Sequence, residues 1–351
     1  MKLIIQIPCL NEEKTLPLTL ADLPRHLPGV DAIEYLVIDD GSTDRTSEVA
    51  RQHGVHHLVR FASRKGLAEA FMAGLDACLK LGADLIVNTD ADNQYRGQDI
   101  EKLVRPILER KADMVIGDRQ VENIAHFSPL KIRLQKLGSW VVRHVSETSV
   151  PDATSGFRAY SREAALRMNV ISRFTYTLET IIQAGKKHIA LSHVQINTNG
   201  KLRESRLFTS IPDYLKRSIG TIFRIYLMYE PLKAFSWIGG VVFALGLTGA
   251  GRFLYYYFTG DGGGHVQSLI LSAVFMIVGF QIVMIGLVAD LIAGNRRLQE
   301  DALYRIKKLE LLSLERSESA ALNGTAGGNL NVAAAPAPVP TLAEKVLSED
   351  A

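Results

Sequence analysis

The chain has 351 residues, enough for one large domain or two smaller ones with an ample core. Its formal net charge of +3 argues neither for nor against nucleic acid, so the distribution of charge matters more than its sum. The two cysteines, Cys9 and Cys78, are far apart in sequence, which excludes a disulfide framework and a zinc site and is typical of a reducing compartment. The strand-like run Leu3–Ile7 is too short for a signal peptide.

Strand and helix patterns alternate over residues 1 to about 115. Strand-like runs occur at Leu3–Ile7, Tyr35–Ile38, Val55–Arg60, Leu85–Asn88 and Met114–Gly117, and helical patterns at Thr15–Leu27, Thr43–His53, Gly66–Leu81 and Gln98–Arg110. Repeated strand-helix-strand units with short connections predict an α/β fold with a doubly wound, mostly parallel sheet. Ligands bind such sheets at the carboxyl ends of the strands.

Polar clusters follow three of these strands on that edge. They are Pro8–Glu13, Asp39–Asp44 and Asn88–Tyr95. Each can also be explained as a solvated turn or as the start of a helix. Local structure alone does not explain why acidic groups gather at the ligand edge. Arg64–Leu67 adds basic donors and a helix N-terminus suited to phosphate, with a solvated loop as the alternative.

Asp90 and Asp92 stand one residue apart at a strand end, so both carboxylates can reach one metal ion. Carboxylate oxygens suit Mg²⁺ or Mn²⁺, and these ions commonly bridge protein carboxylates to substrate phosphates. The pair therefore predicts a site for a nucleotide diphosphate, with Gln94 as a further oxygen ligand. Asp-X-Asp is a weak signal by itself, because it also occurs as a solvated acidic turn.

The C-terminal third predicts membrane attachment. Phe208–Tyr229 reads as an amphipathic helix on a membrane surface, with a core-facing helix as the alternative. Ala234–Tyr257 and Val266–Ile292 are two apolar spans that each exceed the roughly 20 residues needed to cross a bilayer. Lys and Arg flank both spans and are absent from 253–295, which predicts that both termini and the N-terminal α/β domain lie in the cytoplasm.

We divide the chain accordingly. Residues 1–207 form the cytoplasmic domain, 208–232 the amphipathic juxtamembrane helices, 233–294 two transmembrane helices, 295–316 a charged helical segment and 317–351 a disordered tail rich in Ala, Gly and Pro.

Taken together, the motifs resemble those of inverting glycosyltransferases of family 2. The matching runs are Pro8–Glu12, Asp39–Asp44, Arg64–Ala68 and Asp90–Gln94. Gly117–Arg119, Arg133 and Asp152–Arg158 resemble the polyprenyl-phosphate branch, which includes dolichyl-phosphate mannose synthases and bacterial undecaprenyl-phosphate glycosyltransferases. The resemblance implies a nucleotide-sugar-binding domain of the GT-A type. Leu137 stands where this branch commonly has a serine, which puts a hydroxyl contact to the acceptor phosphate in doubt.

The resemblance also implies roles for individual residues. The donor nucleotide would be bound by Pro8, Leu10, Asn11, Glu12, Asp39, Asp40, Lys65, Gly66, Asp90 and Ala91, and the metal by Asp90, Asp92 and Gln94. The acceptor phosphate would be bound by Arg119, Arg133, Arg203 and Arg206, because arginine can fork two donors onto phosphate oxygens. Asp92, Asp152 and Arg119 would be the catalytic residues. A merely solvated face is the interpretation for most of the other basic residues of 118–230.

These inferences predict a metal-dependent, membrane-anchored enzyme of cell-envelope biogenesis. It would move one sugar from a UDP- or GDP-sugar to polyprenyl phosphate at the cytoplasmic leaflet of the plasma membrane, inverting the anomeric centre. Asp152 could position, stabilise charge or accept a proton, and the sequence does not choose among these roles. The sugar, the nucleoside and homo-oligomerisation also stay open, and nucleic acid is not an expected partner. A processive polysaccharide synthase and a catalytically silent scaffold are the alternatives.

Overall fold

A computed structural model describes residues 1–120, 129–171, 175–200, 211–260 and 265–326, with the side chains of 129–137, 211–218 and 318–326 outside the description. The chain divides into two compact units. Unit 1 contains Met1–Thr221 and the chain from Tyr304 onwards, and unit 2 contains Ile222–Leu303.

Unit 1 is built on a seven-stranded sheet of order β3-β2-β1-β4-β6-β5-β7. The strands are β1 (Lys2–Cys9), β2 (Ala32–Asp39), β3 (His57–Arg60), β4 (Leu85–Asn88), β5 (Met114–Asp118), β6 (Arg158–Ser161) and β7 (Leu191–Gln195). All pairings are parallel except those of β6, which runs antiparallel to β4 and β5. The doubly wound, mostly parallel sheet predicted from the sequence is confirmed.

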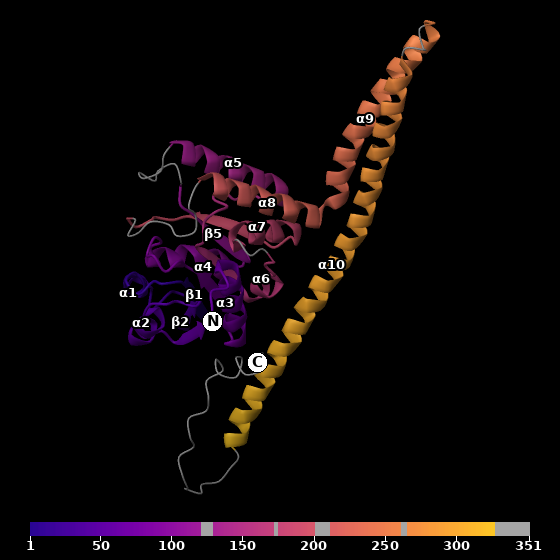
Figure 1. Cartoon of the computed structure of the whole chain (residues 1–351). Helices are drawn as coiled ribbons and strands as arrows, with labels where there is room; N and C mark the ends of the chain where they lie inside the picture. Colours follow the sequence, from indigo (N-terminus) through magenta and orange to yellow (C-terminus); the bar gives the residue numbers. More distant parts are fainter. Residues whose placement is uncertain (121–128, 172–174, 201–210, 261–264, 327–351) are drawn as a thin grey trace. The chain divides into compact units, whose positions relative to one another are not determined.

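Helices cover both faces of this sheet (Figure 1). α1 (Leu16–Asp22) and α4 (Ile100–Leu108), which follows a 3₁₀ turn at Gly97–Asp99, share one core with β1 and β2, and α2 (Thr46–Gln52) joins it through Ala50. α3 (Leu67–Lys80), α6 (Arg162–Arg167) and α7 (Tyr176–Lys186) belong to the other face, where the ring of Phe71 stacks on Tyr176 at 4.0 Å. α5 (Pro129–Ser146) packs against α7.

The structure corrects several predicted boundaries. The helix predicted to reach Leu27 ends at Asp22, because Leu23 precedes Pro24 and takes an extended conformation. The strands β6 and β7 were not predicted. Residues 317–326, assigned to the disordered tail, continue α10 (Val266–Ala326) as helix.

Unit 2 holds the last part of α8 (Ile211–Tyr229), α9 (Pro231–Phe258) and the first part of α10. α9 and α10 are long and apolar enough to cross a membrane, and only 11% and 17% of their most apolar stretches are buried. A core helix of a soluble protein would be mostly buried, so this exposure agrees with the predicted membrane spans.

Small residues bring α9 and α10 into close contact. A Cβ atom added at Gly279 would lie 2.6 Å from the backbone nitrogen of Phe243 and 2.8 Å from the carbonyl oxygen of Gly239. A Cβ atom at Gly246 would lie 2.7 Å from the carbonyl oxygen of Ser272. Backbone-to-backbone packing of this kind is the usual way in which helices associate in lipid.

The part of α10 that belongs to unit 1 packs on α3 and α6. Lys80 Nζ lies 3.1 Å from Glu310 Oε1, and Arg162 forms an ion pair with Glu315. Tyr304 donates a 3.1 Å hydrogen bond from its hydroxyl to Glu163. From Tyr304 onwards, the charged segment predicted from the sequence is therefore docked on helices of unit 1.

We predict that Gly279→Leu destabilises unit 2, because the new side chain meets backbone atoms that cannot move without separating the helices. Overpacking of this kind costs about 1–3 kcal/mol. Gly294→Leu, on the same helix at a position with no atom within 4 Å of an added Cβ, is the matched control. The measurement is thermal unfolding of the detergent-solubilised protein by circular dichroism. Equal midpoints for the two variants would show that the close contact is unimportant.

Candidate functional site

Loops from four parallel strands meet at one edge of the sheet. β1, β2, β4 and β5 all present their carboxyl ends there. β6 runs the other way, so its amino end, which follows Asp152–Phe157, arrives at the same edge. The fold therefore brings the loop that begins at Asp152 to the strand ends that carry Asp90 and Arg119.

Hydrogen bonds join the three loops expected to hold the nucleotide. The backbone N–H of Thr43 donates to Asn11 Oδ1 at 2.8 Å, which links the loops after β1 and β2. The backbone N–H groups of Lys65 and Gly66 donate to Asp40 Oδ1 at 2.6 and 3.1 Å, which links the loops after β2 and β3. Asn11 and Asp40 therefore shape this edge through their own loop contacts.

Other residues of the predicted nucleotide set lie beneath the loops. The Asp39 carboxylate is fully buried, accepts from the Ser42 N–H at 2.8 Å and is bonded by Ser47. The Glu12 carboxylate is also buried and accepts from the Thr15 hydroxyl at 2.6 Å.

The remaining members of the set differ in exposure. Pro8 is buried within β1, Leu10 is half-buried just after it, and the Lys65 side chain is exposed, with its ammonium 4.8 Å from the ring centre of Phe61.

Asp90, Asp92 and Gln94 are all half-buried in the loop after β4. Asp92 Oδ1 accepts the backbone N–H of Gln94 at 3.1 Å, and Thr19 fixes the carbonyl of the buried Ala91 at 3.0 Å. Asn93, which lies between Asp92 and Gln94, has φ 55°. Its buried Oδ1 accepts no hydrogen bond from the described residues.

These groups fit a hard divalent cation. The described residues hold no cluster of three or more His, Cys, Asp or Glu side chains suited to a metal. The donors predicted here are fewer, two carboxylates and an amide oxygen. Mg²⁺ and Mn²⁺ accept this kind of donor set when substrate phosphates and water supply the other ligands.

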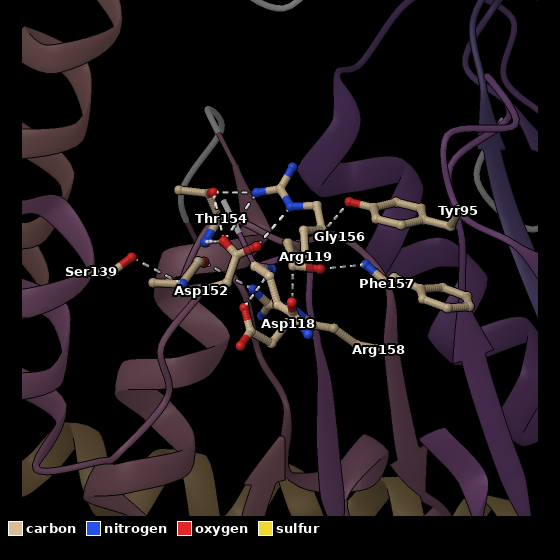
Figure 2. Close-up of polar contacts among 12 residues, drawn as sticks. Tyr95, Asp118, Arg119, Ser139, Asp152, Thr154, Gly156, Phe157 and Arg158 are labelled. Atoms are coloured by element: carbon tan, nitrogen blue, oxygen red, sulfur yellow. Dashed lines mark hydrogen bonds and ion pairs between the residues drawn. The ribbon is translucent and has the colours of Figure 1, made fainter. Parts of the chain in front are cut away.

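Arg119 and Asp152 form a bidentate ion pair beside this loop (Figure 2). Arg119 Nε donates to Asp152 Oδ2 at 2.7 Å, and Nη2 donates to Oδ1 at 3.0 Å. Nη2 also donates to the Thr154 hydroxyl at 2.6 Å. The two side chains are 8% and 2% exposed, while the second terminal nitrogen, Nη1, makes no hydrogen bond within the described part of the chain.

This pairing determines the charge of both groups. Burial alone would raise the pKa of Asp152, but the charge and hydrogen bonds of Arg119 outweigh it and hold that pKa below its usual range. Burial alone would lower the pKa of Arg119, yet the Asp152 charge raises it. At neutral pH the pair is therefore a carboxylate and a guanidinium, and Asp152 is poorly suited to accept a proton.

Gly156 brings the Asp152 loop against the predicted metal ligands. A Cβ atom at Gly156 would lie 3.1 and 3.2 Å from the two carboxylate oxygens of Asp90 and 2.8 Å from the Tyr176 hydroxyl. The Gly156 N–H donates to the Tyr95 hydroxyl at 3.0 Å, and its carbonyl accepts from Asn88 Nδ2 at 2.9 Å. A larger residue at Gly156 would have to displace Asp90 or Tyr176. The glycine thus lets the loop that bonds Arg119 lie against the predicted donor side.

Three predicted acceptor residues cannot be placed at the site. The side chain of Arg133 lies outside the description, as does that of Leu137, and Arg203 and Arg206 lie outside the described residues. Their assignment stays a prediction.

Sequence reasoning did not assign roles to Asn88, Tyr95, Thr154 or Tyr176. Burial raises the pKa of Tyr95 to about 12, and its ring stacks on Phe157 at 4.9 Å. The one signal in the sequence that could have predicted this network was Asn88, a polar residue within an apolar strand. A buried amide needs hydrogen-bond partners, so its position indicates polar groups nearby.

Comparisons with known proteins agree with this geometry. Residues 4–167 match the profile of Glycosyl transferase family 2. The chain is 30% identical over 217 residues to the UDP-N-acetylglucosamine–dolichyl-phosphate N-acetylglucosaminyltransferase of Methanococcus voltae, covering 55% of this chain and 83% of that protein. It is 31% identical over 166 residues to the undecaprenyl-phosphate mannosyltransferase of Micrococcus luteus, covering 46% and 66%.

A solved structure shares the fold. Glucosyl-3-phosphoglycerate synthase from Mycobacterium tuberculosis, in complex with Mn²⁺, UDP-glucose and phosphoglyceric acid, superposes with a TM-score of 0.51 at 20% identity, over 64% of this chain and 78% of that one. At this identity the likeness shows the fold alone, which is the GT-A-like architecture expected from the sequence. With the profile match and the M. voltae relative, the conclusion is that this chain belongs to glycosyl transferase family 2.

Proposed function

We propose that this glycosyltransferase moves one sugar from a nucleotide diphosphate sugar to a polyprenyl phosphate at the cytoplasmic leaflet of the membrane. The relatives that carry lipid-phosphate acceptors in their names support the acceptor class. The observation that carries the proposal is the close approach of Gly156, in the loop that bonds Arg119, to Asp90. It brings a carboxylate pair suited to a donor-bound metal near a buried arginine suited to phosphate.

Arg119 is the acceptor-binding group in this proposal. Asp152 and Thr154 occupy Nε and Nη2, which leaves Nη1 to donate to a phosphate oxygen. Because both occupied nitrogens are anchored to one loop, the guanidinium is held in a single orientation before the lipid arrives. Arginine held in this way gives a directed, charge-assisted hydrogen bond.

Asp90, Asp92 and Gln94 would hold the divalent cation on the donor side. When bound, this cation would offset the negative charge that develops on the leaving diphosphate. Asn11 and the loop around Lys65 would lie along the nucleotide, as the linked loops after β1, β2 and β3 suggest.

The reaction needs no strong protein base. A phosphate monoester loses its second proton near pH 6, so the acceptor is an anionic nucleophile at neutral pH. One of its oxygens forms the bond to the anomeric carbon as the bond from that carbon to the donor diphosphate breaks, and the electron pair leaves with the diphosphate. Attack from the opposite face inverts the anomeric centre. Asp152 positions Arg119 in this step and transfers no proton.

Two alternative functions agree less well with the residues of this chain. Processive polysaccharide synthases of the same superfamily carry Gln-X-X-Arg-Trp, whereas the two tryptophans here, Trp140 and Trp237, each follow serine. A silent scaffold would have no need for a buried Arg119–Asp152 pair beside intact Asp90 and Asp92.

The deciding experiment incubates the purified protein with a panel of UDP- and GDP-sugars and undecaprenyl phosphate, with mass spectrometry of the lipid. We expect one glycosyl-phosphoryl lipid carrying a single sugar. A long polymer would support the synthase instead, and the absence of both transfer and donor hydrolysis would support the scaffold.

We predict that Asp92→Asn lowers turnover by about 100-fold or more, because it removes one of two carboxylates from the cation. Binding of Mn²⁺ with UDP, measured by calorimetry, should weaken in parallel. Asp31→Asn, which changes an exposed carboxylate at the amino end of β2, is the control. Full activity of Asp92→Asn in the presence of a chelator would exclude the metal role.

The pH dependence of transfer follows from the charges at the site. Asp152 has a lowered pKa, so the stability it contributes is present above its unfolded value of about 3.9 and is lost only at lower pH. Neither Asp152 nor Arg119 titrates between pH 5 and 8. We therefore expect kcat/KM for the lipid phosphate to fall about tenfold from pH 7 to pH 5, following the acceptor phosphate. A profile that stays flat to pH 5 would contradict this nucleophile.

We also predict the topology. A reporter fused after Arg297 should report the cytoplasm, and one inserted at Gly262 the outer side, because Lys and Arg flank the two spans and are absent between them. The measurement is a pair of compartment-specific fusion activities. The reverse pattern would place unit 1 outside the cell, where nucleotide sugars are scarce.

A further inference from the structure

Arg158 is a fully buried cation beneath the site. It lies at the start of β6, opposite Asn88 of β4 and Ile116 of β5, and its exposure is 0%. No carboxylate in the described part of the chain forms an ion pair with it. A buried guanidinium is very unfavourable unless hydrogen bonds replace its water, so the partners of Arg158 indicate what it is for.

Its donors connect the Asp152 loop to α7. Arg158 Nε donates to the carbonyl of Ser155 at 2.7 Å, and Nη2 donates to the carbonyl of Ala153 at 3.1 Å. Nη1 donates to the carbonyl of Thr177 at 2.9 Å and to the hydroxyl of Thr180 at 2.5 Å. In Figure 2 the Arg158 side chain lies on the side of this loop away from Arg119.

These bonds fix most of the loop that holds Arg119. Asp152 and Thr154, which bond Arg119, alternate along the chain with Ala153 and Ser155, whose carbonyls accept from Arg158. Arg119 is bonded by the side chains of Asp152 and Thr154, whereas Arg158 donates to the backbone carbonyls of Ala153 and Ser155. The loop is thus bonded to two guanidinium groups, that of Arg119 at the site and that of the fully buried Arg158.

Arginine is the side chain that this geometry requires. Its planar group carries five N–H donors in a rigid fork, and here three nitrogens serve four oxygens on two elements. Lysine keeps the charge but offers three donors from one nitrogen, so it cannot serve the loop and α7 with the same directions.

We propose that Arg158 is a positioning residue for the acceptor side of the reaction, acting through the loop of Asp152 and Thr154 on the orientation of Arg119. This inference rests on the proposed function for its kinetic consequence. It goes beyond the proposed function because it gives a buried side chain, which has no access to substrate, control over the use of the acceptor.

The test compares three variants with the wild type in detergent. Arg158→Lys keeps the charge and loses the fork, and Thr180→Val removes the hydroxyl that fixes Nη1 from α7. Gln183→Met is the matched control, because Gln183 is an equally buried polar residue of α7 that bonds Asn169 and makes no contact with the Asp152 loop. Each is measured for thermal midpoint, calorimetric binding of UDP with Mn²⁺, kinetics with undecaprenyl phosphate, and amide hydrogen exchange of 152–157.

We expect Arg158→Lys to lower kcat/KM for the lipid phosphate by about 10- to 100-fold, mainly through KM, with UDP binding unchanged. Thr180→Val should act in the same direction to a smaller extent, and it decides the question if Arg158→Lys does not fold. Both should speed exchange in 152–157. Gln183→Met should lower the thermal midpoint without changing KM or that exchange.

Two results would overturn the positioning role. The first is a loss of activity in Arg158→Lys that is no larger than its unfolded fraction, with KM for the lipid phosphate unchanged. The second is an amide hydrogen exchange rate in 152–157 that is the same in Thr180→Val as in the wild type. Faster exchange in a protein whose wild type transfers no sugar to the lipid phosphate would instead uphold the role of Arg158 and remove the proposed acceptor.

Discussion

The ion pair between Arg119 and Asp152 is the constraint on which the site depends. Both side chains are withdrawn from water, and taking two charges out of water costs several kcal/mol per ion unless the geometry is close to ideal. A pair of well-packed apolar residues would commonly be at least as stable, so stability gives no reason to keep these charges. Their arrangement instead fixes the direction of a guanidinium nitrogen at the edge of the sheet, where we propose that the acceptor phosphate binds.

Antiparallel β6 is what makes this pair possible. A purely parallel sheet would send Asp152 to the far edge, whereas the reversed strand begins at the edge where β4 and β5 end. The same reversal places Gly156 against Asp90 and buries Arg158 below the loop. The predicted donor and acceptor groups are thus set side by side by strand direction, and the polar network beneath them holds the loop in place.

The sequence predicted the N-terminal sheet, its functional edge and the two spans, because each depends on apolar runs that end in polar clusters. It did not predict β6, since Arg158 interrupts the pattern of a short buried strand and its hydrogen-bond partners are distant in sequence. It also did not predict that the Asp40 carboxylate accepts from the N–H groups of Lys65 and Gly66, and the ligand contact of Asp40 stays a prediction. It predicted a charged helical segment at 295–316 but no partner for Glu310, because the complementary Lys80 lies on another helix. The local pattern of apolar and polar residues predicts strands and their ends. Contacts between residues that are distant in sequence can be found only from the folded structure.

The central claim is that the acceptor is recognised as a phosphate. It is tested most directly by measuring kcat/KM of the wild-type protein for undecaprenyl phosphate, for undecaprenol and for a soluble sugar, with the same donor. The alcohol offers neither an anionic nucleophile nor a ligand for Arg119, so we expect product with the lipid phosphate alone. Glycosylation of undecaprenol or of the soluble sugar as readily as of undecaprenyl phosphate would contradict it.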